Sequence, residues 1–134
     1  MRRIGTAIFV ICLAAVLTWS TDRLRFEEKE TIERTLSFQD SAMTREVQVD
    51  NIFGAISVEG HGGQEVRLTV HKTIKARTQD KVAIARRQVT LDITEDGNTI
   101  DLYVNGPFRC QNRRKGRRCN HDPGYQVHYN FILK

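Results

Sequence analysis

The sequence lacks the short motifs by which most enzymes are recognised. It contains no G-x-S-x-G nucleophile elbow, no H-E-x-x-H zinc helix and no glycine loop of the kind that cradles a phosphate. It also offers no serine, histidine and carboxylate in an arrangement that indicates a catalytic triad. These absences predict a protein that is not an enzyme, and we expect no cofactor.

Long apolar runs are also absent, except for one at the start of the chain. Arg2 and Arg3 precede the almost wholly apolar residues 4–19, and polarity resumes at Ser20. This run of 16 residues is shorter than the roughly 20 that a membrane-spanning helix needs. We therefore expect residues 1–20 to be a secretory signal peptide. Because no Ala-x-Ala cleavage pattern is present, an uncleaved signal anchor is the alternative. Both predict export to the periplasm or the cell surface.

Residues 21–134 are expected to form a single β-rich domain, because about 114 residues suit one modest core. The net charge of the whole chain is +5, of which the two leader arginines supply +2. Residues 107–119 hold six basic side chains and no acidic one, so the rest of the domain sums to −3. The basic character therefore belongs to one segment. Its basic residues are Arg109, Arg113, Arg114, Lys115, Arg117 and Arg118.

Cysteine is scarce, and the two cysteines of the domain lie within this basic segment. In an exported protein, Cys110 and Cys119 are expected to form a disulfide. Closing so short a loop would stabilise the fold by about 2 to 3 kcal/mol. The alternative is a metal site that uses both thiolates with His121 and His128. The spacing C-x8-C-x-H, however, matches no common structural zinc pattern.

Alternating apolar residues with many β-branched side chains indicate strands through most of the domain. The expected strands cover residues 31–38, 46–49, 55–58 and 65–74. The bends fall at asparagine and glycine, which adopt positive φ angles at low steric cost. The residues expected to do so are Asn51, Gly54, Gly60, Gly62 and Gly63. The predicted fold class is mainly β, with antiparallel or solenoid-like strands and one short helix.

The short helix is expected at residues 79–88. Thr78 suits the N-cap and Asp80 suits the positive end of the helix dipole. Arg86 and Arg87 suit its last turn. The residues at helical spacing that would face the sheet are Val82, Ala85 and Val89.

A hairpin is expected over residues 89–104, turning at Asp96 and Gly97, a pair favoured in two-residue type I′ turns. The register deduced from that turn places Asp92 directly opposite Asp101. Two facing carboxylates would repel each other, and such a pair could bind a cation or act as an acid/base couple. The alternative is a solvated pair neutralised by a nearby Lys or Arg. We favour the solvated pair, because nothing else in the sequence completes a site.

Another strand is expected over residues 125–133. Its aromatic and aliphatic residues alternate with polar ones and are predicted to face the core rather than to form a stacking platform for bases. They are Tyr125, Val127, Tyr129 and Phe131. No cap or edge protection follows this strand, so we expect the native chain to continue past Lys134.

The order of these features resembles a bacterial adhesin-like family of unknown function. The resemblance covers residues 31–134 and rests on four stretches, VDNIFGAISVEG, EVRLTVHK, VTLDITEDGNTIDLYV and YQVHYNFIL. The bend Asn51-x-x-Gly54-x-Ile56-x-Val58 is its most specific element. The resemblance implies an exported domain of the β-solenoid or β-helix type, of which this chain would be the opening part. It implies no catalytic residues.

Two functions are therefore expected from the sequence. The first is a non-enzymatic cell-envelope module that acts as a scaffold or adhesin. The alternative is a polyanion binder, in which residues 109–118 attract lipopolysaccharide phosphates, acidic glycans or extracellular nucleic acid without sequence specificity. For the basic segment itself, a solvated loop that keeps the protein soluble is the simpler interpretation. Membrane association is expected only through the leader.

Overall fold

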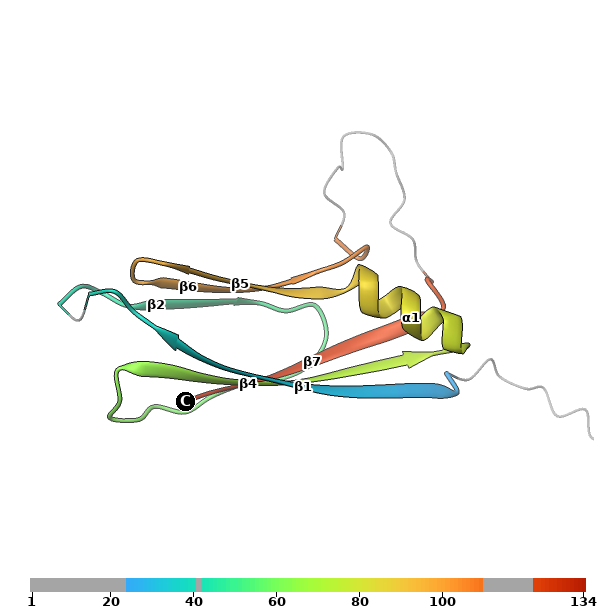
Figure 1. Ribbon diagram of the computed structural model, residues 1–134, viewed down its shortest axis with the longest axis horizontal. Helices are drawn as coiled ribbons and strands as arrows, with labels where there is room; N and C mark the ends of the chain where they lie inside the picture. The colour runs from blue at the N-terminus through green and yellow to red at the C-terminus, as the bar shows by residue number, and fades with distance from the viewer. Residues whose placement is uncertain (1–23, 41, 110–121) are drawn as a thin grey trace, which may run out of the picture.

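Two β-sheets lie face to face in the computed structural model, which describes residues 24–40, 42–109 and 122–134 (Figure 1). In the four-stranded sheet the order of neighbours is β1 (Phe26–Ser37), β4 (Glu65–Ala76), β7 (Tyr125–Leu133) and β3 (Ile56–Val58). In the three-stranded sheet it is β2 (Glu46–Asp50), β6 (Thr99–Asn105) and β5 (Thr90–Asp96). The mainly β prediction is confirmed, although the described strands form two layers and no solenoid coil. The leader lies outside the described residues.

Both sheets mix parallel and antiparallel pairs. Strand β4 is antiparallel to β1 and to β7, whereas the short β3 runs parallel to β7. Strand β6 is antiparallel to β5 and parallel to β2. The chain crosses between the layers several times, for example from β2 to β3 through residues 51–55 (Figure 1). Strands that are distant in sequence therefore become neighbours.

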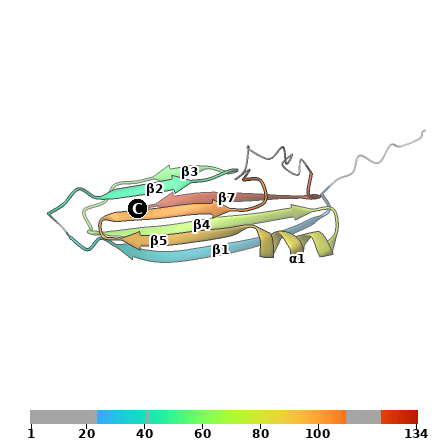
Figure 2. The ribbon, with the colours of Figure 1, turned by 90° about the horizontal axis from the view of Figure 1, so that it is seen from above.

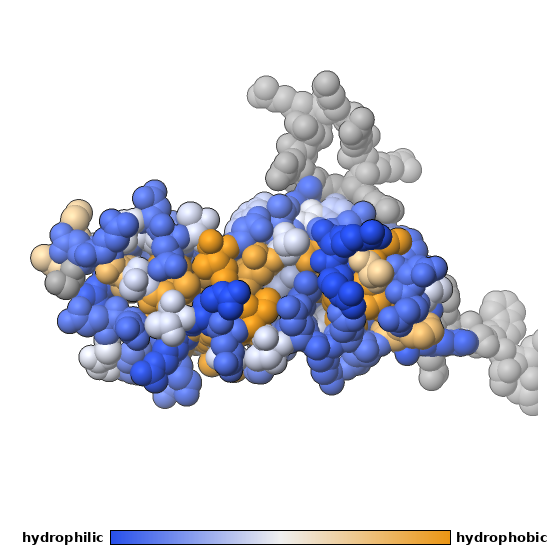
Figure 3. All heavy atoms as spheres, viewed as in Figure 1, coloured by the Kyte–Doolittle hydropathy of each residue, from blue (hydrophilic) through white to orange (hydrophobic). Residues whose placement is uncertain are grey.

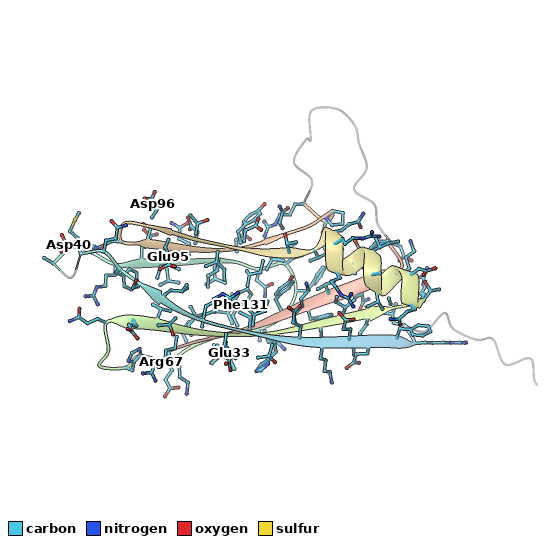
Figure 4. The ribbon with its side chains drawn as sticks, in the orientation of Figure 1. Glu33, Asp40, Arg67, Glu95, Asp96 and Phe131 are labelled. Atoms are coloured by element: carbon cyan, nitrogen blue, oxygen red, sulfur yellow. The ribbon has the colours of Figure 1, made fainter. Side chains whose placement is uncertain are left out.

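The core lies between the layers, where the alternate residues of β4, β6 and β7 meet. Phe131 points into this space from β7 (Figure 4) and is 1% exposed. The core face predicted for the last strand is confirmed, because all four of its expected members are buried. The inward residues of these three strands are Leu68, Val70, Ile74, Ala76, Ile100, Leu102, Val104, Tyr125, Val127, Tyr129, Phe131 and Leu133.

Helix α1 (Gln79–Gln88) begins and ends where the sequence predicts. The Thr78 hydroxyl accepts a hydrogen bond from the Lys81 backbone N–H at 3.3 Å, which satisfies one of the N–H groups at the helix start. Val82, Ala85 and the following Val89 are buried, as expected. The helix covers one end of the space between the sheets, next to β1 and β4 (Figure 2).

The hairpin of β5 and β6 forms, but its predicted turn and register are wrong. The turn residues are Gly97 and Asn98, and Asp96 closes the ladder opposite Thr99. Gly97 has φ +59, and a glycine in the first of two turn positions suits a type II′ turn. Another segment of the same chain stabilises this turn, because the backbone N–H of Gln39 donates to Gly97 O and the N–H of Glu46 donates to Asn98 O.

The predicted turn glycines behave in two ways. Gly54 has φ +121 beside β7, and a Cβ there would lie 2.1 Å from the carbonyl oxygen of Tyr129. Only glycine fits such an approach. The prediction of positive φ is wrong for Asn51 and for Gly60, Gly62 and Gly63. Asn51 nevertheless fixes the bend, because its side-chain amide donates to Tyr129 O at 2.9 Å.

Candidate functional site

The predicted carboxylate pair is not formed. Asp92 lies opposite Tyr103, and Asp101 lies opposite Thr94. The two aspartates still share the outer face of the three-stranded sheet, and Asp92 is within 3.4 Å of the side-chain amide of Asn105. Within the described ranges, no three His, Cys, Asp or Glu side chains come close enough to hold a metal ion.

Carboxylates dominate the three-stranded sheet. Its strands contain six acidic residues and neither lysine nor arginine. Glu95 points towards the interior, where it accepts a hydrogen bond from the Ser37 backbone at 3.0 Å, whereas Asp96 points away from it (Figure 4). The pairing register puts five carboxylates on the outer face. They are Glu46, Asp50, Asp92, Asp96 and Asp101.

Arg109, predicted to bind polyanions, is held by this acidic face. Its guanidinium makes two hydrogen bonds to the Asp50 carboxylate, at 2.8 and 3.0 Å, and its central carbon lies 3.9 Å from the centroid of the Tyr103 ring. The hydrogen bonds from Arg109 hold the pKa of Asp50 below its usual value. Arg109 therefore anchors the start of the basic segment to the sheet. The other five basic residues lie outside the described part of the chain.

The two predicted cysteines and His121 also lie outside the described residues, so the disulfide and the metal site stay predictions. His128 is described and lies on the outer side of β7, where its ring is 6.1 Å from that of Phe53. His61, in the connection from β3 to β4, accepts a hydrogen bond from Gly63 N at 2.8 Å. The His61 side chain is exposed.

A groove of about 310 Å³ opens between the two layers at the edge formed by β2 and β3. Its floor and walls come from inward-facing aliphatic and aromatic residues, and charged residues lie at its rim. The apolar lining consists of Phe38, Val47, Val49, Val58, Val66 and Leu133. The rim includes Arg45, Glu59, His61, Glu65 and Lys134. The groove is therefore an apolar slot with polar borders, which is the usual composition of a binding site.

Several exposed hydrophobic side chains gather at this edge. Val58 is 74% exposed, Ile56 47% and Val47 36%. Parallel pairing sets Ile56 beside Phe131 and Val58 beside Leu133. Ile56 and Val58 therefore point towards the space between the two sheets. They remain exposed because no strand of the other sheet covers them. The alternation of residues 56–58 was visible in the sequence, but this lack of cover was not.

A second unpredicted feature is a lysine inside the core. Lys72 follows the inward alternation of β4 and is only 6% exposed. Its ammonium group donates to Val89 O at 3.1 Å and lies 5.5 Å from the centroid of the Tyr129 ring. The Tyr129 hydroxyl donates to the same carbonyl at 3.2 Å. Burial lowers the pKa of Lys72 and raises that of Tyr129.

Among the described residues, one carboxylate lies within 4.0 Å of the Lys72 ammonium group. Its nearest carboxylate oxygen belongs to Glu30, at 3.9 Å, and the Glu30 side chain is half exposed. Lys72 does not line the groove between the layers. The lysine therefore acts as a structural donor, and the groove beside β2 is the candidate functional site.

The chain matches no family model, no curated protein and no solved structure. The described part of the chain also contains no helix that is long and apolar enough to cross a membrane.

Proposed function

We propose that this chain is a non-enzymatic, exported cell-envelope protein whose β-domain works by binding, as an adhesin-like or scaffold module. The observation that carries the proposal is the apolar groove between β2 and β3. An exposed apolar patch that is bordered by polar residues often marks a site where a protein meets a partner. The leader pattern of residues 1–20 and the resemblance of residues 31–134 support a role outside the cytoplasm.

The export part of the proposal is tested by location. The full chain with a C-terminal tag is expressed in a bacterial host beside a variant that lacks residues 2–20. We expect the full chain in the periplasmic or surface fraction and the shortened variant in the cytoplasm. An equal cytoplasmic distribution of the two would contradict export. The intact mass of the exported protein, measured without reduction, then reports whether the leader is cleaved and whether Cys110 and Cys119 are bridged.

The second candidate function is polyanion binding through the basic segment. The contact of Arg109 with Asp50 favours it in one respect, because it fixes the start of the segment whose sequence holds five further basic residues. Binding to immobilised heparin should then fall steeply between low and moderate salt. It should be lost when those five residues become glutamine, whereas equal retention of that variant would contradict the proposal. They are Arg113, Arg114, Lys115, Arg117 and Arg118.

We propose no cofactor. That this domain opens a longer β-solenoid, as the resemblance implies, also stays a proposal. Further turn-and-strand repeats in a longer native chain would support it.

A further inference from the structure

The two layers contain unequal numbers of strands. Four strands form one sheet and three form the other, and Figure 2 shows β3 extending beyond β2 at one edge. Strand β2 pairs only with β6, so the N–H and C=O groups along its other side have no strand partner among the described residues. Beside β2, and above β3, the three-stranded sheet is therefore short of one strand.

The opposite edge, formed by β1 and β5, is protected in a different way. The inward positions of β1 include Glu28 and Glu30, and Glu28 forms an ion pair with Arg86 of the helix. Figure 3 looks onto this edge and shows hydrophilic residues lying over hydrophobic ones. Inward-pointing charges discourage a further strand from pairing. At the β3 edge the corresponding inward positions are Ile56 and Val58, which carry no charge that would discourage a further strand.

We propose that the groove accepts one extended segment of a partner polypeptide, which pairs with the free edge of β2 as a fourth strand. Main-chain hydrogen bonds to β2 would hold the segment, and its inward side chains would cover Val58 and Ile56 and fill the groove. Strand addition of this kind is a recurring mode of peptide recognition. The groove meets both requirements, because it combines an unpaired strand edge with an apolar slot beneath it.

Charge complementarity defines the other face of the segment. On the outer face its side chains would lie beside Glu46 at one end of β2 and beside Asp50, which is already paired with Arg109, at the other. The strands of this sheet contain no lysine or arginine. Opposite charges on neighbouring strands stabilise a sheet, and like charges destabilise it. The partner segment should therefore alternate apolar residues, facing in, with basic residues, facing out.

A second copy of this chain fits the groove less well. Two copies that paired through β2 with their layers aligned would place both overhanging β3 strands in the same space. A single strand from a partner avoids this collision. The inference rests on the proposed function, which assigns a binding role to the chain. The binding assay below does not depend on where the protein is located, and the fractionation above does not depend on binding. Their failures can therefore be told apart.

The test uses the full-length chain purified from expressing cells and a labelled seven-residue peptide, blocked at both ends, that alternates lysine with valine. Binding is followed by fluorescence anisotropy. The variant Val58→Asp places a charge in the groove, and its matched control Ser57→Asp places the same charge on the opposite face of β3. Both residues are exposed, so both variants should fold, which circular dichroism checks.

We expect Val58→Asp to weaken peptide binding by about tenfold or more and Ser57→Asp by less than about threefold. A peptide alternating glutamate with valine should bind at least about tenfold more weakly than the lysine peptide. Absence of binding up to about 1 mM peptide would overturn the proposal, as would equal effects of the two variants or equal binding of the two peptides. A dimer that Val58→Asp dissociates and the peptide does not would also overturn it, in favour of self-association.

Discussion

Replacing Lys72 by methionine is expected to stabilise the protein. The ammonium group is buried at 6% exposure, and the only carboxylate within 4.0 Å in the described structure, that of Glu30, is half exposed to water. Methionine has a similar length and flexibility, so it fills the same space without a charge. The substitution therefore separates the electrostatic cost of this side chain from its packing.

The magnitude follows from the contacts. Burying the ammonium group costs several kcal/mol. Against this stand the hydrogen bond to Val89 O at 3.1 Å, which contributes about 1.5 to 3 kcal/mol, and the attraction to Glu30 at 3.9 Å, which contributes at most about 1 kcal/mol. The Val89 carbonyl keeps the Tyr129 hydroxyl as a donor after the substitution. We expect a net gain of about 1 kcal/mol in the free energy of unfolding at pH 7.

Urea unfolding followed by circular dichroism measures this difference, and its pH dependence checks the cause. Because the pKa of Lys72 is lowered in the folded state, the unfolded chain binds that proton more tightly. Raising the pH from neutral towards the ordinary lysine value of 10.5 should therefore stabilise the wild type relative to the variant, and the difference should shrink. Destabilisation by Lys72→Met of more than about 1 kcal/mol at pH 7, or a difference that grows with pH, would refute the reasoning.

Three further predictions concern the frame around the core. Gly54→Ala should cost about 3 kcal/mol or more in urea unfolding, because its Cβ would lie 2.1 Å from Tyr129 O. In the control Gly60→Ala the added Cβ would meet no atom within 4 Å, so stability should change by less than about 1 kcal/mol. Similar costs for the two variants would contradict the assigned bend. Asp50→Asn should cost at most about 1 kcal/mol, since Asp50 is 58% exposed. Because the pKa of Asp50 is lowered in the folded protein, its charge adds stability above the ordinary pKa of 3.8, and this stability is lost as the pH falls below that value. The variant should therefore lose less stability on acidification than the wild type, and an unchanged acid profile would contradict the Arg109 pair. Cys110→Ser should cost about 2 to 3 kcal/mol relative to the unreduced wild type, and reduction of the wild type should give the same loss; no effect of either would argue against the disulfide.

The faces of the strands could be predicted from the sequence, but their partners could not. The predicted and observed hairpin registers differ by two residues, so Leu91 lies opposite Val104 rather than opposite Leu102. Because side chains alternate with a period of two, this shift leaves the same aliphatic residues facing the core. The prediction therefore had the right core face and the wrong pairs, and the aspartate pair was lost with them.

The reason for the wrong turn lies elsewhere in the chain. The side-chain amide of Asn98 donates to Asp40 O at 2.8 Å, and its oxygen accepts from Asp40 N at 2.8 Å. These contacts join the hairpin tip to the connection between β1 and β2, which is 58 residues away. Local preference for Asp96 and Gly97 in a turn was outweighed by tertiary hydrogen bonds that sequence patterns do not report.

The start of β1 shows the same limit. A strand was expected from residue 31, yet β1 begins at Phe26 and includes the highly charged residues 27–30. Such residues suit an edge strand, and here Glu27 lies 3.5 Å from Lys75 on the neighbouring β4. Intrinsic strand preference is weak at these positions, so only the long partner β4 makes them a strand.

The groove could not be predicted from the sequence, for a related reason. The sequence shows that Ile56 and Val58 share one face, but their exposure depends on how many strands the opposite sheet contains. The chain protects its other edge with Glu28 and Glu30 at inward positions, so polar residues at such positions are compatible with this fold. The partner strand proposed above would cover the aliphatic side chains at positions 56 and 58.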